Sequence, residues 1–227
     1  MLSKAKIKQV HALELKKHRD EQRAFVAEGS KTVTDLLGTF ACQWIAALPE
    51  WFEAHASQLP TDCERIPTDR DTLSRASLLK SPPEVVALFR HPADADLRLA
   101  DPTHEWVIAL DGVQDPGNLG TIIRIADWFG IGNIYCSTET ADVYNPKVVQ
   151  ATMGSIARVR LHYGDLEAML ELAEESGGAD EEAEVRDMYA QTKAEFEKLN
   201  ILNLLSGEVD PNDAFLSIHA GAGGTEA

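Results

Sequence analysis

Cysteine is scarce in this chain of 227 residues, and long apolar runs are missing. The three cysteines, Cys42, Cys63 and Cys136, lie far apart in the sequence and form no CxxC pair, so neither a disulfide framework nor a zinc ribbon is indicated. The histidines show no metal-ligand spacing. No apolar run approaches the roughly 18 residues of a membrane-spanning helix, and no apolar stretch follows the basic N-terminus as in a signal peptide. These absences predict a cytoplasmic protein with neither a membrane span nor a metal site.

Basic residues are also few, because 21 Lys and Arg stand against 37 Asp and Glu. The resulting net charge of −16 argues against a nucleic-acid partner. The acidity is uneven, however: residues 1–164 hold 18 basic and 21 acidic residues, whereas residues 165–227 hold 3 and 16. Most of the acidity therefore belongs to the last quarter, and the charge does not exclude an RNA partner for the first 164 residues.

The front of the chain is its most basic part, with 8 Lys and Arg against 4 Asp and Glu in residues 1–32. The pattern from Leu2 to Arg23 predicts one helix with a basic face, which either contacts phosphates or is simply solvated. Strands and helices then alternate, which predicts a small α/β domain over residues 1–92 followed by a linker over 93–103. The expected strands are Ala24–Ala27 and Gln43–Ala47, and the expected helices run through Val33–Leu37, Trp51–His55, Asp69–Ser77 and Pro83–Phe89.

The most informative stretch runs from Trp106 to Cys136 and reads as a βαβ unit. Trp106–Leu110 is an apolar run typical of a parallel strand buried on both faces. Asn118 is a good N-cap for the helix that follows, in which apolar residues recur at helical spacing. Ile134–Cys136 begins the next strand.

The loop before this helix is rich in Gly and Asn, so it offers backbone N–H groups to an anion. Arg124 lies on the face opposite the apolar stripe, where its guanidinium could hold a phosphate or a carboxylate. A nucleotide-like substrate fits this pattern, but so does a tight strand-to-helix connection with a surface arginine. The glycines do not form GxGxxG, so the dinucleotide fingerprint is excluded.

Residue identities around this helix resemble motif 1 of the SpoU-type RNA 2′-O-ribose methyltransferases of the knotted SPOUT class, with Asn118, Gly120, Arg124 and Ala126 at the matching positions. Residues 145–160 are similar to motif 2 of that family. The first 90 residues, with Lys16-Lys17 and residues 25–29, look like the ribosomal-protein-like domain that binds the substrate in many members. The resemblance implies an α/β chain with a substrate-binding domain at 1–92 and a partial SPOUT methyltransferase domain at 104–164.

What the resemblance implies is methyl transfer from S-adenosylmethionine to a ribose 2′-hydroxyl of ribosomal or transfer RNA, by a homodimer. Arg124 is the residue credited with activating the hydroxyl, either by holding the neighbouring phosphate and stabilising alkoxide charge or, if strongly perturbed, as a base. Carried over residue by residue, the implied site comprises the catalytic Arg124 and Asn118, the cofactor-binding Thr152, Met153 and Gly154, and the RNA-binding Lys16, Lys17, Arg19, Gly120 and Lys147.

The third motif of that family is not recognisable after residue 164. Residues 165–227 read as a mainly helical segment with one terminal strand, Ala214–His219, and residues 204–227 closely resemble bacterial peptide chain release factors of the second type. We therefore interpret the chain as a mosaic: a methyltransferase that stops before motif 3, joined to a release-factor piece through which the ribosome would be a partner. This interpretation predicts weak or absent binding of S-adenosylmethionine. A non-catalytic RNA-binding module and a release-factor fragment remain the alternatives to an enzyme.

Overall fold

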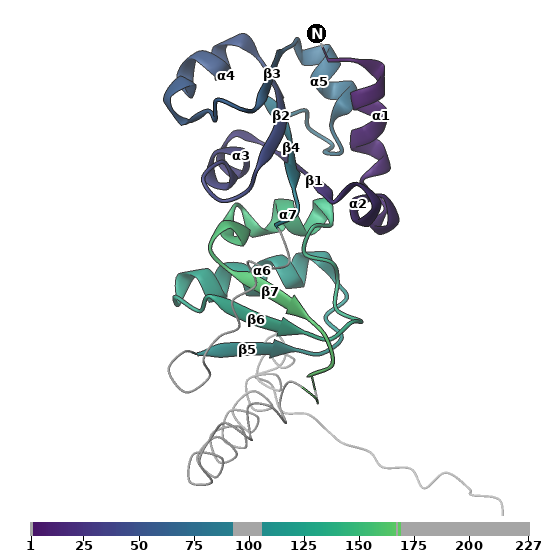
Figure 1. The fold of residues 1–227 in the computed structure, drawn as a ribbon, viewed down its shortest axis with the longest axis vertical. Helices are drawn as coiled ribbons and strands as arrows, with labels where there is room; N and C mark the ends of the chain where they lie inside the picture. The colour runs from purple at the N-terminus through teal and green to yellow at the C-terminus, as the bar shows by residue number, and fades with distance from the viewer. Residues whose placement is uncertain (1, 93–105, 167, 169–227) are drawn as a thin grey trace, which may run out of the picture. The chain divides into compact units, whose positions relative to one another are not determined.

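The computed structural model describes residues 2–92, 106–166 and 168, all of which lie in the unit Met1–Ala173. Two sheets organise this part of the chain (Figure 1), one in the front domain and one in the domain that follows. Among these residues no helix is both long and apolar enough to cross a membrane. The predicted linker at 93–103 and the predicted helices and strand after residue 168 lie outside the described residues.

The front domain is built on a four-stranded sheet in the order β1-β4-β2-β3. β4 lies between β1 and β2 and is antiparallel to both, whereas β3 is parallel to β2. The strands are β1 (Ala24–Glu28), β2 (Cys42–Ala47), β3 (Glu64–Pro67) and β4 (Val85–Arg90). The helices are α1 (Lys4–Ala12), α2 (Lys16–Gln22), α3 (Ser30–Leu36), α4 (Pro49–Ala54), the 3₁₀ turn η1 (Ala56–Gln58) and α5 (Arg70–Ala76).

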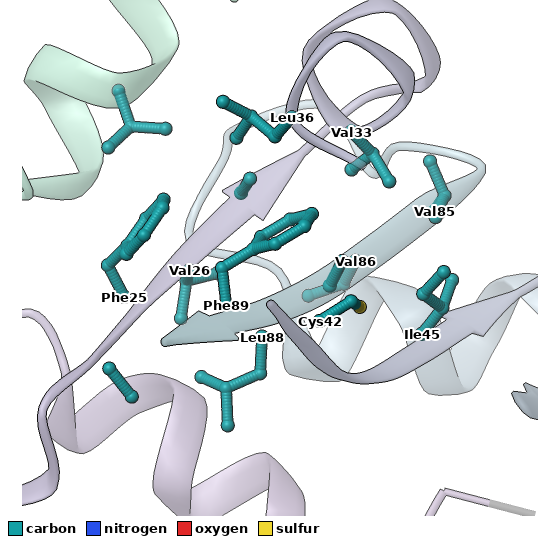
Figure 2. Packing of buried hydrophobic residues seen from close by; sticks show 14 of the residues in the cluster. Phe25, Val26, Val33, Leu36, Cys42, Ile45, Val85, Val86, Leu88 and Phe89 are labelled. Carbon is teal, nitrogen blue, oxygen red and sulfur yellow. The ribbon is translucent and has the colours of Figure 1, made fainter. Parts of the chain in front are cut away.

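The core of this domain gathers around the central strand. Figure 2 shows Val33 and Leu36 of α3 directed toward the sheet that carries Val85 and Phe89. The rings of Phe25 and Phe89, from paired strands, stack with centroids 5.7 Å apart. Alternation of strands and helices thus produces the α/β domain expected from the sequence.

The predicted helix over Pro83–Phe89 is wrong, because this segment forms strand β4. Residues Val85–Phe89 are fully buried and hydrogen-bond to β1 on one side and to β2 on the other. A short apolar run fits a buried strand as well as a buried helix, and only partner strands distant in sequence decide between them. Strand β3 was not among the predicted elements.

The single helix predicted from Leu2 to Arg23 is also wrong, since α1 and α2 are separate helices. The chain turns at Leu13, which is fully buried. The Arg19 guanidinium donates to the carbonyls of Leu13 (2.7 Å) and Glu14 (2.8 Å) and so satisfies acceptors that the break leaves open.

Within residues 106–166 the second domain has three parallel strands in the order β5-β6-β7, with a helix between each pair, which confirms the predicted βαβ unit. Its elements are β5 (Val107–Leu110), α6 (Pro116–Trp128), β6 (Asn133–Cys136), α7 (Pro146–Thr152), η3 (Ser155–Ala157) and β7 (Arg160–Tyr163). The apolar stripe of α6 is buried, as its spacing predicts.

Burial of β5 on both faces is not found among the described residues. Trp106 is 77% exposed and Val107 is 37% exposed, whereas Leu110 is buried. Both helices of the βαβαβ run lie on the same side of the three strands in Figure 1. The apolar character of β5 therefore indicated a buried strand, but the described residues cover only one of its faces.

Candidate functional site

The N-terminus of α6 is capped by Asp115, so the prediction of Asn118 as the N-cap is wrong. Pro116 occupies the first turn, where its missing N–H is not needed. The Asp115 carboxylate accepts a 2.7 Å hydrogen bond from the backbone N–H of Asn118. This carboxylate takes up one of the donors that the sequence analysis had assigned to a substrate anion, and the Asn118 side chain is left exposed.

Arg124 is exposed on α6, on the face turned away from the buried stripe. Within the described residues its guanidinium makes no hydrogen bond and no ion pair, so it is free to bind an anion. Thr121 lies one turn and Gly117 two turns nearer the N-terminus on the same stripe, and both are also exposed. Helical spacing alone placed Arg124 correctly, and the structure leaves it available for the role that the sequence implies.

Gly120, predicted to contact RNA, is buried where α6 meets α7. A Cβ atom built on Gly120 would lie 2.4 Å from the Cβ of Ala151 and 3.0 Å from its backbone carbonyl carbon. The structure therefore gives Gly120 a packing role: it lets the two motif helices approach closely and so fixes the position of α6 against α7.

Gly120→Ala is expected to destabilise the chain by about 1–3 kcal/mol, because the added methyl overlaps Ala151. Chemical denaturation measures this. Gly132→Ala is the matched control, since a Cβ at Gly132 meets no atom within 4 Å. Adding Ala151→Gly to Gly120→Ala should recover part of the loss, and a loss unchanged in the double variant would contradict the helix–helix explanation.

Motif 2 forms helix α7, which begins after the Asn145 cap at Pro146, as its capping residues predicted. The helix ends through two left-handed residues, Met153 (φ 51°) and Gly154 (φ 95°). This turn is the place where the sequence analysis expected the cofactor.

The three predicted cofactor residues differ in what they can reach. The Thr152 hydroxyl is fully buried and donates to the Val149 carbonyl at 2.7 Å. The Cα of Gly154 faces Asp35 of α3, and a Cβ there would lie 2.4 Å from a carboxylate oxygen. Only Met153 presents an exposed side chain. Among the described residues of this turn, only Met153 can therefore reach a cofactor with its side chain, whereas Thr152 and Gly154 can offer backbone groups alone.

An acidic and basic cluster beside this turn was missed by the sequence analysis. Arg158 donates to both carboxylate oxygens of Asp127, at 2.8 and 2.7 Å, and lies 4.0 Å from Asp35. The hydrogen bonds from Arg158 hold the pKa of Asp127 below its ordinary value. The three residues lie far apart in the sequence, and no local spacing indicates that they meet.

The predicted RNA-binding residues divide into exposed and buried ones. Lys16, Lys17 and Lys147 are exposed, and Lys17 lies 3.8 Å from Glu21 in an exposed pair. Arg19 is 1% exposed, so its assignment to RNA is wrong. Its guanidinium donates to one carboxylate oxygen of Asp142, at 2.8 Å from Nε and 2.7 Å from Nη2, in the loop before α7.

A hollow of about 280 Å³ lies beside Lys147. Its lining includes Glu28, whose carboxylate accepts hydrogen bonds from the Ser77 hydroxyl and from the Leu78 backbone N–H. Burial raises the pKa of Glu28. Pro116, at the start of α6, lines the same hollow, so Lys147 and the first turn of α6 border one recess.

Two family models match the chain. Residues 4–87 match the MRM3-like substrate binding domain, and residues 105–200 match the SpoU rRNA Methylase family. The second match extends beyond residue 164, where the sequence analysis placed the end of the methyltransferase domain.

Individual proteins show the same similarity. The chain is 30% identical over 154 residues to the 23S rRNA (guanosine(2553)-2′-O)-methyltransferase RlmP of Bacillus subtilis. The aligned region covers 66% of this chain and 58% of that relative. The AdoMet-bound rRNA methyltransferase of Sinorhizobium meliloti superposes with a TM-score of 0.63 at 31% identity, over 75% of this chain and 66% of the other. Peptide chain release factor 2 of Treponema pallidum is 41% identical over 81 residues, which are 36% of this chain and 22% of that protein.

The two α/β domains have the architecture of these RNA methyltransferases, with a substrate-binding domain in front. Over residues 105–200 the chain is a member of the SpoU rRNA methylase family, and over residues 4–87 it carries an MRM3-like substrate-binding domain. It spans just over half the length of the Bacillus relative. Part of the chain is similar to peptide chain release factor 2, as the sequence analysis inferred.

Proposed function

We propose that this chain methylates a ribose 2′-hydroxyl of ribosomal RNA, with S-adenosylmethionine as the methyl donor. The observation that carries the proposal is the exposed guanidinium of Arg124, which has no protein partner among the described residues. Its helix is held in position by the close contact of Gly120 with Ala151. An unpaired arginine on a rigid helix is what the recognition of a phosphate or of a developing oxyanion requires.

Arg124 acts as a cation in this proposal. A guanidinium in water stays protonated, so it cannot easily accept the proton of the 2′-hydroxyl. It instead holds the phosphate next to the target ribose and stabilises the negative charge that grows on the 2′-oxygen as its proton leaves. Asn118, exposed nearer the helix N-terminus, positions the ribose through its side-chain amide.

The front domain delivers the RNA. Lys16 and Lys17 are exposed at the start of α2, where they can contact phosphates without disturbing the core. Lys147 lies on α7 beside the first turn of α6 and provides a third cation near the motif helices. The similarity of residues 4–87 to a substrate-binding domain supports the proposal that the front domain binds the RNA.

The double change Lys16→Glu and Lys17→Glu is expected to weaken RNA binding by about tenfold or more, because two phosphate contacts are replaced by repulsion. The slope of log affinity against log salt should fall by about one for each lost contact. Fluorescence anisotropy with a labelled rRNA fragment measures both. Lys31→Glu is the control, since Lys31 already pairs with Asp35 at 2.9 Å; equal losses in both variants would indicate a nonspecific charge effect.

Transfer of labelled methyl groups from S-adenosylmethionine to rRNA tests the proposal itself. The assay is run at saturating cofactor, because the Thr152 hydroxyl already donates within the chain and Gly154 has no side chain with which to bind the cofactor. The second candidate, a non-catalytic RNA-binding module, is favoured by this lack of side-chain contacts to a cofactor. It predicts salt-dependent RNA binding with no label transferred, whereas the enzyme transfers label in proportion to protein.

A further inference from the structure

Two cysteines that are distant in the sequence lie side by side in the front domain. Cys42 begins β2 and Cys63 immediately precedes β3, and the parallel pairing of these strands brings the residues together. Their sulfur atoms are 3.0 Å apart. Both side chains are buried, with exposures of 8% and 6%. A covalent bond between them requires the sulfurs to approach by about 1 Å, since a disulfide is about 2.0 Å long.

The surroundings favour reaction of this pair with a small oxidant. Cys42 lines a surface hollow together with Lys6, Trp44 and Arg90, so a molecule the size of a peroxide can approach the pair from the Cys42 side. The hydrogen bond between the two sulfurs lowers the pKa of Cys63, which increases its thiolate fraction. Large thiol reagents are excluded by the burial of both side chains.

We propose that Cys42 and Cys63 form a reversible intramolecular disulfide when the chain is exposed to a peroxide. One thiolate attacks a peroxide oxygen, so that an S–O bond forms, the O–O bond breaks, and the departing hydroxide takes up a proton to become water. The second sulfur then attacks the sulfenic acid, so that the S–S bond forms, the S–O bond breaks, and a second water leaves with its proton. The two thiols lose two electrons and two protons, and hydrogen peroxide is reduced to two waters.

The bond would tie the edge strand β3 to β2 and close a loop that contains α4 and η1. Closing this loop restricts the unfolded chain, so the oxidised protein melts at a higher temperature than the reduced one. An increase of about 5 °C or more is expected for a domain of this size. Cys136 lies in β6, in the other domain, and stays a thiol.

Thiol counting and peptide mapping of the full chain test the proposal. After hydrogen peroxide treatment and unfolding, one thiol per chain should remain titratable instead of three, and dithiothreitol should restore all three. No Lys or Arg occurs between Cys42 and Cys63, so trypsin leaves both in one peptide, which should be lighter by two hydrogens. Cleavage after Glu50 and Glu53 should then give two cysteine-containing peptides that separate only after reduction.

Two variants test which cysteines form the bond. Cys136→Ser should still lose both remaining thiols and gain the higher melting temperature, whereas Cys63→Ser should show neither change. Peptide mapping of the wild-type chain shows by itself whether the disulfide forms, and it does not depend on the folding of any variant. Three titratable thiols after treatment, a bond that involves Cys136, or oxidation of Cys42 or Cys63 to sulfinic acid without a cross-link would each overturn the proposal.

Discussion

Arg124→Ala is expected to lower the rate of methyl transfer by about 100-fold or more while changing RNA affinity by less than about threefold. The loss removes a cation placed where charge develops, and single groups of this kind contribute about 10²–10³ in rate. Stability should not change, because within the described residues Arg124 has no hydrogen bond or ion pair to lose. Single-turnover transfer of labelled methyl groups, measured beside RNA anisotropy, separates the two effects.

Two controls make this test specific. Arg124→Lys keeps the charge but not the planar fork, so it should recover only part of the rate. Arg70→Ala removes another exposed arginine, at the start of α5, and should leave the rate unchanged. If Arg124→Ala retains most of the wild-type rate, Arg124 does not have the role proposed for it.

Asp142→Ala is expected to destabilise the chain by about 3 kcal/mol or more. Asp142 pairs with Arg19, whose side chain is only 2% exposed, so the change leaves an arginine buried without its counter-charge. The aspartate also accepts a hydrogen bond from the Tyr144 backbone N–H at 2.9 Å, which would be lost as well. Urea denaturation followed by tryptophan fluorescence measures the difference.

Asp127→Ala is the matched control for this second prediction. It removes an aspartate from another close pair, but its partner Arg158 is half exposed, so the expected loss is below about 1 kcal/mol. The two ion pairs themselves differ in burial and not in length, because both have an N–O distance of 2.7 Å. Equal losses in the two variants would show that the burial of Arg19 is not what makes its pair important.

The methyltransferase half could be predicted from the sequence because its signals are local. The apolar spacing of α6, the proline at the start of α7 and the glycine at its end each act within a few residues. The error at Asn118 was of the same local kind: Asp115 followed by Pro116 is a stronger start signal, and it could have been recognised from the sequence.

The errors in the front domain have a different origin. Whether the run ending at Phe89 forms a strand is decided by hydrogen bonds to β1 and β2, which are distant in sequence. Arg19 lies among charged neighbours on a polar helix, a pattern typical of a solvated surface, yet Asp142 buries it. The closeness of Cys42 and Cys63 likewise depends on a strand, β3, that the sequence pattern did not reveal.

The most direct measurement of the central claim is the chemical position of the methyl group in the product. Ribosomal RNA is incubated with the chain and saturating S-adenosylmethionine, digested to nucleosides and analysed by mass spectrometry. The account predicts a 2′-O-methylated nucleoside that is formed by the wild-type chain and nearly absent with Arg124→Ala. A methylated base, or RNA that binds the chain but acquires no methyl group, would contradict it.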